Sequence, residues 1–468
     1  MDINLSFLGA ARSVTGSRYL VEANNTTLLV DCGLYQEREF LHRNWEHFQV
    51  PPEKIAAVLL THAHLDHCGL LPRLVNEGFR GRIICTRPTA EITKIILLDS
   101  AKLQEEDASY KKKRHLREGR RGPYPEIPLY TVADAEAVLP LFHPVEYNRP
   151  VEISPGIEAV FRDAGHVLGS SMIKLTVSRK KEKRSIIFSG DIGRWDRPIL
   201  PDPTIFSRVD YIVMESTYGD RAHTGSHEIG EQLAEIVRSA FAAGGNIIVP
   251  SFALQRAQEL LYYLFTLGQD GRIPDLQVYL DSPMAIKINQ VYRRYSWLFD
   301  REMKAMMRDA KSPFDFPGLN LVETVAQSKS LNDIKGTVMI IAGSGMCTGG
   351  RIKHHLINNI SRPECTVLFV GYQAEGTLGR HILDGAGSVR IHGQQRPVRA
   401  AIAHIHGLSA HADRDDLLKW LSRLSPEPKH IFITHGEAKA ALIFRQFLEE
   451  KTGFRASVPS YGEKVNLE

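Results

Sequence analysis

Short apolar runs recur along the first half of the chain, separated by turn-forming residues. They are rich in β-branched side chains, which favours strands over helices. The predicted strands are residues 3–8, 18–31, 55–60, 81–85, 157–161, 185–188 and 211–214. Asn24-Asn25 interrupts the second run and predicts a hairpin turn. Apolar residues at helical spacing predict a helix over 88–108, so this half combines a sheet with antiparallel opening strands and covering helices.

The pattern changes after residue 215. Apolar strands now alternate with segments of helical periodicity, which cover 227–243 and 254–267. The predicted strands here are 246–250, 277–280, 337–341 and 366–370. Alternation of strands and helices is typical of a parallel α/β sheet. The sequence therefore predicts a second structural unit that differs from the first.

A dense group of metal-binding side chains, Thr61-His62-Ala63-His64-Leu65-Asp66-His67, directly follows the apolar run 55–60. Imidazoles together with a carboxylate suit zinc. A single tetrahedral ion seldom takes four ligands from one short loop, so the crowding favours two metals. The alternative is a polar loop with incidental histidines, which this density disfavours. Cys68 beside it is interpreted as a small buried residue rather than a ligand.

Further histidines and carboxylates follow other predicted strands. His166 and Asp191 each come after an apolar run and beside a glycine, and His435 follows another apolar run. Each of them is weak evidence when considered singly, but the setting that they share with the first group strengthens the case. Asp31 also ends a strand, where it either orients the ligand loop by hydrogen bonding or forms a turn before glycine.

Composition describes a soluble globular protein, with 43% apolar and 24% charged residues over 468 positions, and this length favours two domains. A net charge of +4 does not by itself indicate a nucleic-acid binder. The five cysteines are scattered without a CxxC pair, so we expect reduced thiols and a cytoplasmic location. We find no secretory signal and no apolar run of membrane-spanning length, so no membrane association is expected.

The strongest charge run is Lys111–Arg121, with seven basic residues and one acidic residue. Such a run is usually a solvated mobile loop. The alternative is an electrostatic contact for phosphates near the metal loop, with Lys112 and Arg114 as candidate substrate-binding residues.

The motifs together resemble a known family. Thr61 to His67, followed by His166 and Asp191, resembles the metallo-β-lactamase fold in its two-zinc hydrolase branch. Glu215, His411 and His435 look like the three additional motifs of the β-CASP subgroup of nucleic-acid-processing nucleases. The resemblance covers essentially the whole chain. Gln255 stands where the family pattern has glycine.

The resemblance implies an α/β fold: a metallo-β-lactamase αββα sandwich with an inserted parallel-sheet β-CASP domain. The long gap between Asp191 and His435 requires such an insertion if both reach one metal pair. The expected domains are 1–215 for the first part of the lactamase domain, 216–395 for the insert, and 396–468 for the C-terminal completion.

The resemblance also implies two zinc ions per chain, and its residue roles are as follows. One ion is held by His62, His64 and His166, the other by Asp66, His67 and His435, and Asp191 bridges both. The pair activates a water as hydroxide for in-line attack on phosphorus, so Asp66 also counts as catalytic. His411, oriented by Glu215, protonates the departing ribose oxygen. Ser409, Arg256 and the basic run are weaker candidates for flanking phosphates.

The implied substrate is single-stranded RNA, because His435 is typically absent from DNA-repair members and a duplex would not easily enter a site between two domains. Endonuclease and 5′→3′ exonuclease modes both remain open. Three alternatives stand beside it: a hydrolase of small esters or thioesters on the same fold, a DNA nuclease of the subgroup, and a non-catalytic RNA-binding scaffold. Family members often dimerise, so a homodimer is one expected assembly state.

Overall fold

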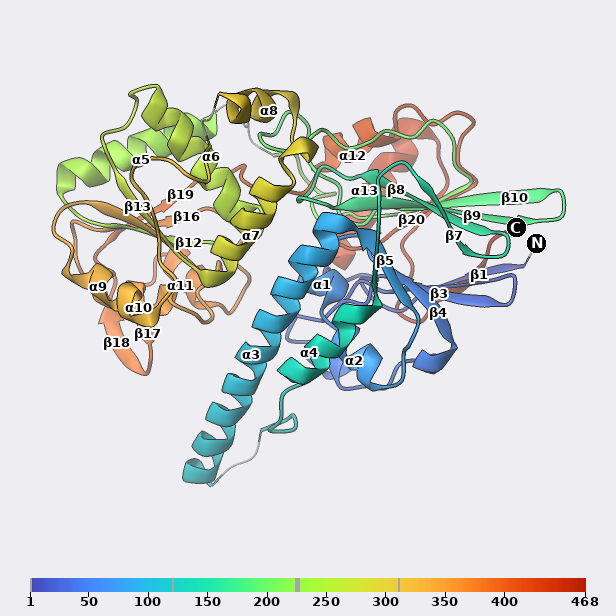
Figure 1. Cartoon of the computed structure of the whole chain (residues 1–468), viewed down its shortest axis with the longest axis horizontal. Helices are drawn as coiled ribbons and strands as arrows, with labels where there is room; N and C mark the ends of the chain where they lie inside the picture. The colour runs from blue at the N-terminus through green and yellow to red at the C-terminus, as the bar shows by residue number, and fades with distance from the viewer. Residues whose placement is uncertain (1, 120–121, 224–227, 310–311) are drawn as a thin grey trace. The chain divides into compact units, whose positions relative to one another are not determined.

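A computed structural model describes residues 2–119, 122–223, 228–309 and 312–468 (Figure 1). The chain divides into two compact units. The first unit comprises Met1–Asp196, Asp202–Ala222 and His411–Glu468, and the second comprises Arg197–Pro201 and His223–Ala410. The second unit is therefore an insertion in the first. Arg120 and Arg121 of the basic run, and residue 227 at the start of a predicted helix, lie outside the described residues.

The first sheet of the first unit has the strand order β22-β1-β2-β3-β4-β5-β6. Its strands are β1 (Ile3–Phe7), β2 (Tyr19–Ala23), β3 (Thr26–Val30), β4 (Ile55–Leu59), β5 (Arg82–Thr86), β6 (Phe142–Val145) and β22 (Lys464–Asn466). The predicted hairpin joins β2 to β3, and Asn24 and Asn25 both have positive φ, as a type I′ turn requires. From β3 to β6 the strands are parallel, so the carboxyl ends of β3 and β4 lie side by side.

The second sheet has the order β21-β20-β11-β10-β9-β8-β7. Its strands are β7 (Pro150–Ser154), β8 (Ile157–Asp163), β9 (Ser171–Arg179), β10 (Glu182–Phe188), β11 (Tyr211–Met214), β20 (His430–Ile433) and β21 (Ala456–Ser457). Strands β10, β11 and β20 are parallel, and β8 points the same way because β9 is antiparallel to both β8 and β10. The segments that follow these four strands therefore meet at one edge of the sheet.

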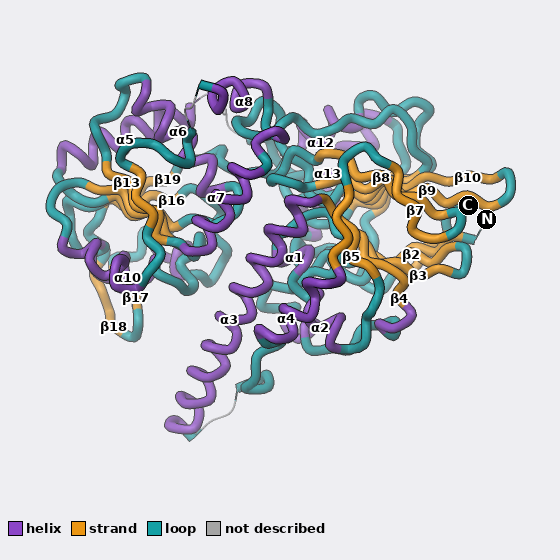
Figure 2. Tube along the Cα trace, viewed as in Figure 1, coloured by secondary structure: helices purple, strands orange, loops and turns teal. Residues whose placement is uncertain are grey.

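Apolar side chains from the facing sides of the two sheets form the central core, with Phe7, Phe161 and Phe188 among them. Helices α1 (Leu65–Cys68), α2 (Leu71–Asn76), α3 (Arg87–Glu118) and α4 (Val132–Val138) belong to the first-sheet side, where α2, α3 and α4 pack on its outer face. Helices α12 (Arg414–Leu421) and α13 (Ala438–Thr452) pack on the outer face of the second sheet. The predicted αββα sandwich is confirmed (Figure 2).

Helix α3 is longer than predicted and contains most of the basic run. It begins after Thr86, whose side chain accepts a hydrogen bond from the backbone of Thr89, and it ends at Gly119 in a left-handed conformation. The interpretation of Lys111–Glu118 as a loop was wrong, because lysine, arginine and glutamate are good helix formers and no helix breaker precedes Gly119. Among the described residues, no helix is both long and apolar enough to cross a membrane.

The second unit contains a six-stranded parallel sheet in the order β14-β13-β15-β12-β16-β19, as predicted, and a separate β17-β18 hairpin. The strands are β12 (Ile247–Pro250), β13 (Gln277–Asp281), β14 (Leu319–Leu321), β15 (Val338–Ala342), β16 (Thr366–Phe369), β17 (Ser388–Ile391), β18 (Gln394–Pro397) and β19 (Ala401–His404). The helices are α5 (Ile229–Ala243), α6 (Arg256–Gln269), α7 (Pro283–Arg294), α8 (Arg301–Arg308), α9 (Val325–Ser330), α10 (Ile352–Asn359) and α11 (Leu378–Leu383).

Strand β19 continues the sheet of the second unit beyond residue 395, where the sequence predicts the end of the insert. It pairs with β16 along its whole length, from Ala401 to His404. The second unit accordingly extends to Ala410, and the chain returns to the first unit at His411.

Gln255 adopts a backbone conformation that glycine usually supplies, with φ of 65° just before α6. Its buried side chain accepts a hydrogen bond from the Tyr292 hydroxyl at 2.5 Å and donates to Glu259 at 3.2 Å. These two bonds hold the glutamine in place although the family pattern has glycine here.

Candidate metal centre

The ligand loop follows β4, and the segment after β3 packs against it. His62 and His64 lie in the loop itself, whereas Asp66 and His67 belong to the one-turn helix α1. The backbone of Cys32 donates to the carbonyl of His67 at 2.8 Å. Gly33 is required at this contact, because a Cβ there would lie 1.6 Å from the carbonyl oxygen of Asp66. The sheet thus fixes the ligand loop through backbone contacts.

The first ligand group brings together His62, His64, His166 and one oxygen of Asp191, all within 4.8 Å of one another. Asp191 Oδ2 lies 3.3 Å from His62 Nε2 and 3.5 Å from His166 Nε2. His64 Nδ1 lies 3.0 Å and 3.3 Å from the same two nitrogens. A tetrahedron with metal–ligand bonds of about 2.0–2.1 Å has edges of about 3.3 Å, so these spacings fit one tetrahedral zinc ion.

The second ligand group contains Asp66, His67 and His435. His67 Nε2 and His435 Nε2 lie 3.0 Å apart, and Asp66 Oδ2 lies 3.6 Å from His435 Nε2. The other oxygen of Asp191, Oδ1, lies 3.2 Å from His67 Nε2 and 3.6 Å from His435 Nε2. Asp191 therefore offers one oxygen to each group, which is the arrangement of a bridging ligand.

The surroundings of Asp191 test whether this donor set fits a metal. Its side chain is 1% exposed, and neither carboxylate oxygen accepts a hydrogen bond from any residue that the structure describes. A buried carboxylate without hydrogen bonds is costly unless a cation compensates it. Burial raises the pKa of Asp191, but the imidazoles of His435 and His67 outweigh burial and hold this pKa well below its ordinary value. The site fits metal cations.

The first group presents neutral imidazoles at neutral pH. Burial, reinforced by His67, lowers the pKa of His62 to about 3, and burial lowers the pKa of His64 to about 4. Burial likewise holds the pKa of His166 well below its ordinary value. A neutral imidazole has a free lone pair, so these three side chains are ready to bind a metal.

The histidines of the second group have raised pKa values, unlike those of the first group. Burial lowers the pKa of His67 and His435, but carboxylates outweigh it, chiefly Asp191, so both values are raised. A proton on either ring takes the place of a cation between these side chains. Metal binding to the second group therefore releases protons, and its metal affinity falls as pH decreases.

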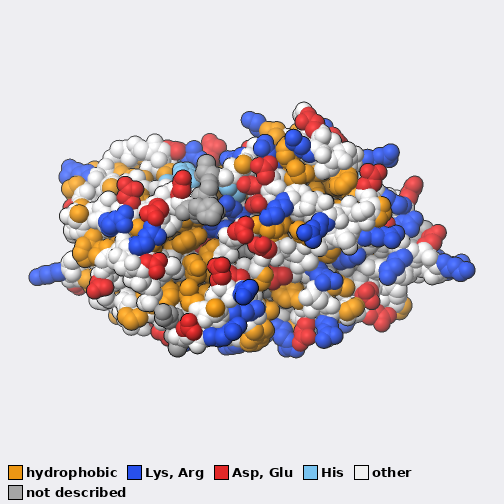
Figure 3. Space-filling view, turned by 90° about the horizontal axis from the view of Figure 1, so that it is seen from above, with side chains coloured by type: hydrophobic (Ala, Val, Ile, Leu, Met, Phe, Trp, Pro, Cys, Tyr) orange, Lys and Arg blue, Asp and Glu red, His pale blue; other side chains and the backbone are white. Residues whose placement is uncertain are grey.

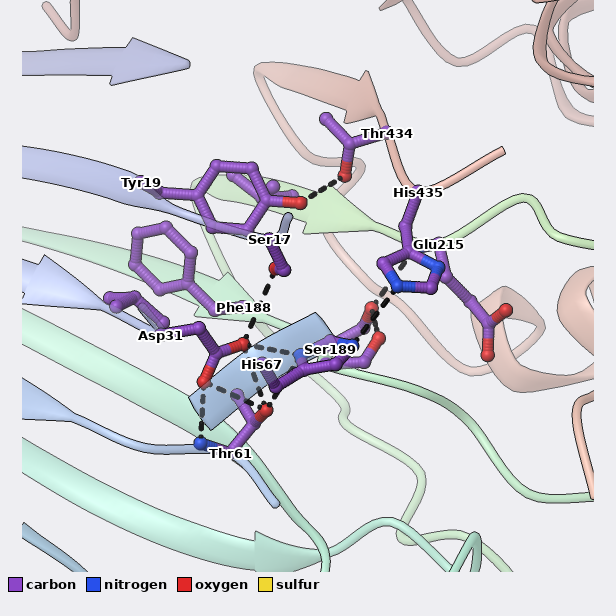
Figure 4. A pocket seen from close by; sticks show the side chains of 13 residues that line it. Ser17, Tyr19, Asp31, Thr61, His67, Phe188, Ser189, Glu215, Thr434 and His435 are labelled. Atoms are coloured by element: carbon purple, nitrogen blue, oxygen red, sulfur yellow. Dashed lines mark hydrogen bonds and ion pairs between the residues drawn. The ribbon is translucent and has the colours of Figure 1, made fainter. Parts of the chain in front are cut away.

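Asp31 lies beside His67 in the lining of a small pocket (Figure 4). Its Oδ2 accepts a hydrogen bond from His67 Nδ1 at 2.7 Å, and its Oδ1 accepts from the backbone of Thr61 at 2.8 Å. The structure thus places Asp31 where it orients a ligand, one of the two alternatives that the sequence leaves open. Sequence reasoning assigned no role to Thr61, which contacts Asp31, and missed Thr217, whose hydroxyl lies 3.2 Å from His435 Nδ1. No spacing pattern distinguishes these threonines from others.

Asp31→Asn is expected to weaken zinc binding about 10- to 100-fold, the usual effect of losing a partner of a ligating histidine. The amide keeps only one acceptor oxygen, so either the Nδ1–H of His67 or the backbone N–H of Thr61 loses its acceptor and the ring of His67 is oriented less firmly. Competition with a chromogenic chelator measures the affinity. Asp107→Asn, a change at an exposed residue of α3, is the control. Equal affinities for the two variants would contradict this role.

His411 and Glu215 lie next to Asp191. His411 Nδ1 is 3.1 Å from Glu215 Oε2, and Glu215 Oε1 accepts a hydrogen bond from the backbone of Ile192 at 2.6 Å. His411 Nδ1 is 3.8 Å from Asp191 Oδ2. Burial lowers the pKa of His411, but Glu215 and Asp191 outweigh it and raise the value to about 9. The imidazole is therefore held protonated at neutral pH, as a proton donor requires.

Two of the weaker candidates, Ser409 and Arg256, belong to the second unit, where Arg256 contacts the buried Glu259 at 3.3 Å. Lys112 and Arg114 are exposed near the far end of α3, about 37 Å and 40 Å along the helix from its start by the usual rise of 1.5 Å per residue. The structure does not place these two beside the metal loop, and a phosphate contact by any of the four residues stays a prediction.

Three family models match successive parts of the chain. Residues 14–251 match the metallo-beta-lactamase superfamily, 257–382 the Beta-Casp domain, and 395–459 the Zn-dependent metallo-hydrolase RNA specificity domain. The ribonuclease TTHA0252 of Thermus thermophilus is 38% identical over 98% of both chains. The chain belongs to the β-CASP family of metallo-β-lactamase proteins. The resemblance stated from its motifs is thereby confirmed.

Other similar proteins are less identical in sequence. The transcription termination factor FttA of Methanocaldococcus jannaschii is 31% identical over 94% of this chain and 68% of its own length. A solved structure of a protein of unknown function from Enterococcus faecalis has a TM-score of 0.55 at 14% identity and covers both chains completely, which supports the fold alone. The family model and the ligand groups together support a metal-dependent hydrolase.

Proposed function

We propose that the protein is a two-zinc ribonuclease that hydrolyses phosphodiester bonds of single-stranded RNA. The observation that carries this proposal is the buried Asp191, which offers one oxygen to each of two ligand groups and lies beside the His411–Glu215 pair. The RNA specificity domain model and the relatives that are named as a ribonuclease and as a transcription termination factor support RNA as the substrate.

The ligands divide between two metal positions. His62, His64 and His166 would hold one zinc ion, Asp66, His67 and His435 would hold the other, and Asp191 would offer one oxygen to each. Zinc bound there would supply an activated water and positive charge for an in-line displacement at phosphorus. Asp31 and Thr217 fix the ring orientation of His67 and His435 through hydrogen bonds to Nδ1.

His411 supplies the proton for the leaving group. Its Nδ1 faces Glu215, which leaves Nε2 as the atom that donates to the departing ribose oxygen. Glu215 is fixed in turn by the backbone of Ile192, so the imidazole is held in one orientation. The carboxylate also favours the protonated ring, which stabilises the acid form at the pH of the reaction.

Glu215→Gln tests this assignment through the pH profile. Proton donation is complete below the pKa of His411 and is lost as pH rises through it, so the alkaline limb of kcat is expected at or below pH 9, since cations bound to Asp191 cancel part of the shift. Glutamine keeps the bond from Ile192 but removes the charge, so the limb moves to lower pH. Zinc content is measured in parallel, and an unchanged profile at equal zinc content would contradict the assignment.

A hydrolase of small esters or thioesters is the main rival on this fold. The match to an RNA specificity domain and the proton donor His411 favour RNA. The cleavage rates of a single-stranded RNA, a single-stranded DNA of equal length and a thioester distinguish the three activities. The proposed ribonuclease cleaves the RNA fastest, a DNA nuclease the DNA, and a small-ester hydrolase the thioester. A non-catalytic scaffold would bind RNA without cleaving any of these substrates.

We also propose that the first compact unit is the lactamase domain, completed by His411–Glu468, and that the second compact unit, which extends to Ala410, is the β-CASP domain. The protein is cytoplasmic and acts as a homodimer. Sedimentation equilibrium at several protein concentrations tests the dimer, which a single species of 52.5 kDa would contradict.

A further inference from the structure

The last turns of α3 carry an exposed surface that the metal centre does not use. From Ser109 to Gly119 all residues except His115 are exposed. Tyr110 is 65% exposed and Leu116 is 85% exposed. Figure 1 shows this end of α3 extending away from the sheets of its unit. These last turns of α3 bury little surface and gain little stability from packing. An exposed surface of this kind is therefore a candidate binding surface.

Four side chains share one face of this helix: Tyr110, Lys113, Arg114 and Arg117, at positions i, i+3, i+4 and i+7. We refer to them as the α3 stripe. Arg114 pairs with Glu118 at 2.9 Å, whereas Lys113 and Arg117 form no ion pair with any residue that the structure describes. An exposed tyrosine beside three cations combines a surface for base stacking with contacts for phosphates.

We propose that the α3 stripe is a second contact for single-stranded RNA, remote from the metal centre. The proposal rests on the proposed ribonuclease function, which makes RNA the polyanion that this chain meets. Tyr110 stacks on a base, while Lys113, Arg114 and Arg117 bind consecutive phosphates. The stripe raises the affinity for long RNA and takes no part in the chemical step.

The length of α3 determines how long an RNA must be to contact both the metal centre and the α3 stripe. The helix begins beside the metal centre, because Thr86 and Thr89 donate to the carbonyl of Gly169, three residues after His166. Tyr110 lies 23 residues further along α3 than Arg87, or about 35 Å at 1.5 Å per residue. At about 3.4 Å per stacked nucleotide, a strand needs about ten nucleotides to span this distance.

The surface charge favours RNA over a second copy of the chain. A copy would place one cationic stripe against another, which is unfavourable, whereas phosphates complement it. Across the face of the protein drawn in Figure 3, basic and acidic side chains are interspersed. Four consecutive cations, Lys111 to Arg114, are therefore a local feature rather than a consequence of net charge, which is +4, although Lys111 pairs with Asp107 and Arg114 with Glu118.

Two variants with the same loss of charge test the proposal. The stripe variant carries Lys113→Gln, Arg114→Gln and Arg117→Gln, which keep helix propensity. The control variant carries Lys180→Gln, Lys181→Gln and Lys183→Gln on the exposed β9–β10 hairpin. Tyr110→Ala is made separately. Circular dichroism confirms that each variant is folded.

Binding is measured by fluorescence anisotropy with a 30-nucleotide single-stranded RNA, with His411→Ala in every protein to suppress cleavage. The stripe variant is expected to bind at least about tenfold more weakly than the control, and the slope of log K against log salt is expected to become shallower by about 2. Tyr110→Ala is expected to weaken binding about fivefold. If the stripe variant binds RNA with the same affinity and salt slope as the control variant, the proposal is overturned. A surface that binds only a protein partner would give this result.

Cleavage by zinc-loaded protein with His411 intact gives the second readout. The stripe variant is expected to raise KM for the 30-nucleotide RNA without changing kcat, and to leave cleavage of a hexanucleotide unchanged. A KM unchanged for both RNAs would overturn the proposal while the ribonuclease function stands. Failure of the wild type to cleave any RNA would refute the ribonuclease function, and the anisotropy result would still decide the RNA contact.

Discussion

Replacement of Asp191 by asparagine is expected to reduce kcat for single-stranded RNA by about 10³-fold or more, because the variant loses the charge that joins the two ligand groups. Removal of one neutral donor from an active site typically reduces rates 10²- to 10³-fold, and a bridging carboxylate contributes more than one such donor. The zinc content measured by atomic absorption is expected to fall from two ions per chain to one or none.

In the metal-free protein the same substitution also removes the ion pairs of Asp191 with His67 and His435. Thermal unfolding of the chelated wild type and variant is therefore the control for folding, with one cooperative transition expected for both and a lower midpoint for the variant. Two tightly bound zinc ions in the Asp191→Asn variant, together with wild-type cleavage, would contradict the bridging role. Asparagine has nearly the same size and shape as aspartate, so the effect of the substitution reports the loss of charge rather than a change in packing.

Replacement of His411 by alanine is expected to lower kcat about 10²- to 10⁴-fold, the usual contribution of a general acid. The zinc content and the KM for RNA are expected to stay close to those of the wild type, because His411 belongs to neither of the proposed ligand sets. Single-turnover cleavage of end-labelled RNA measures the chemical step without product release.

His47→Ala is the matched control, since its imidazole is on the surface of the same unit and its side chain is 95% exposed. An RNA whose leaving group needs no proton, with sulfur in place of the departing oxygen, is expected to restore most of the lost rate in the His411→Ala variant. Equal rate losses on both RNAs would show that His411 does not act as the acid.

The candidate ligand residues could be selected from the sequence because they follow apolar runs. Each of four candidate ligands follows the end of a strand. These are His62 after β4, His166 after β8, Asp191 after β10 and His435 after β20. A parallel arrangement of strands gathers such segments at one edge, so a pattern of strand ends predicts proximity across hundreds of residues. The insertion of a complete unit followed from the same reasoning, because Asp191 and His435 had to meet.

Other features could not be read from local patterns. The basic run resembled a loop because exposed helices and solvated loops share composition, and the structure shows that α3 continues to Glu118. Thr217 acts through its position beside His435, which depends on the pairing of β11 with β20. Gln255 keeps a positive φ through hydrogen bonds to Tyr292 and Glu259, residues that its own segment does not specify.

Two zinc ions per chain are proposed to drive cleavage of single-stranded RNA. Stepwise addition of zinc to chelated protein, with cleavage of an internally labelled single-stranded RNA followed at each step, tests this. The rate is expected to rise until two zinc ions are bound per chain and not to rise further, and the Asp191→Asn variant is expected not to recover at any zinc level. A protein that holds two zinc ions and leaves the RNA intact would contradict this proposal.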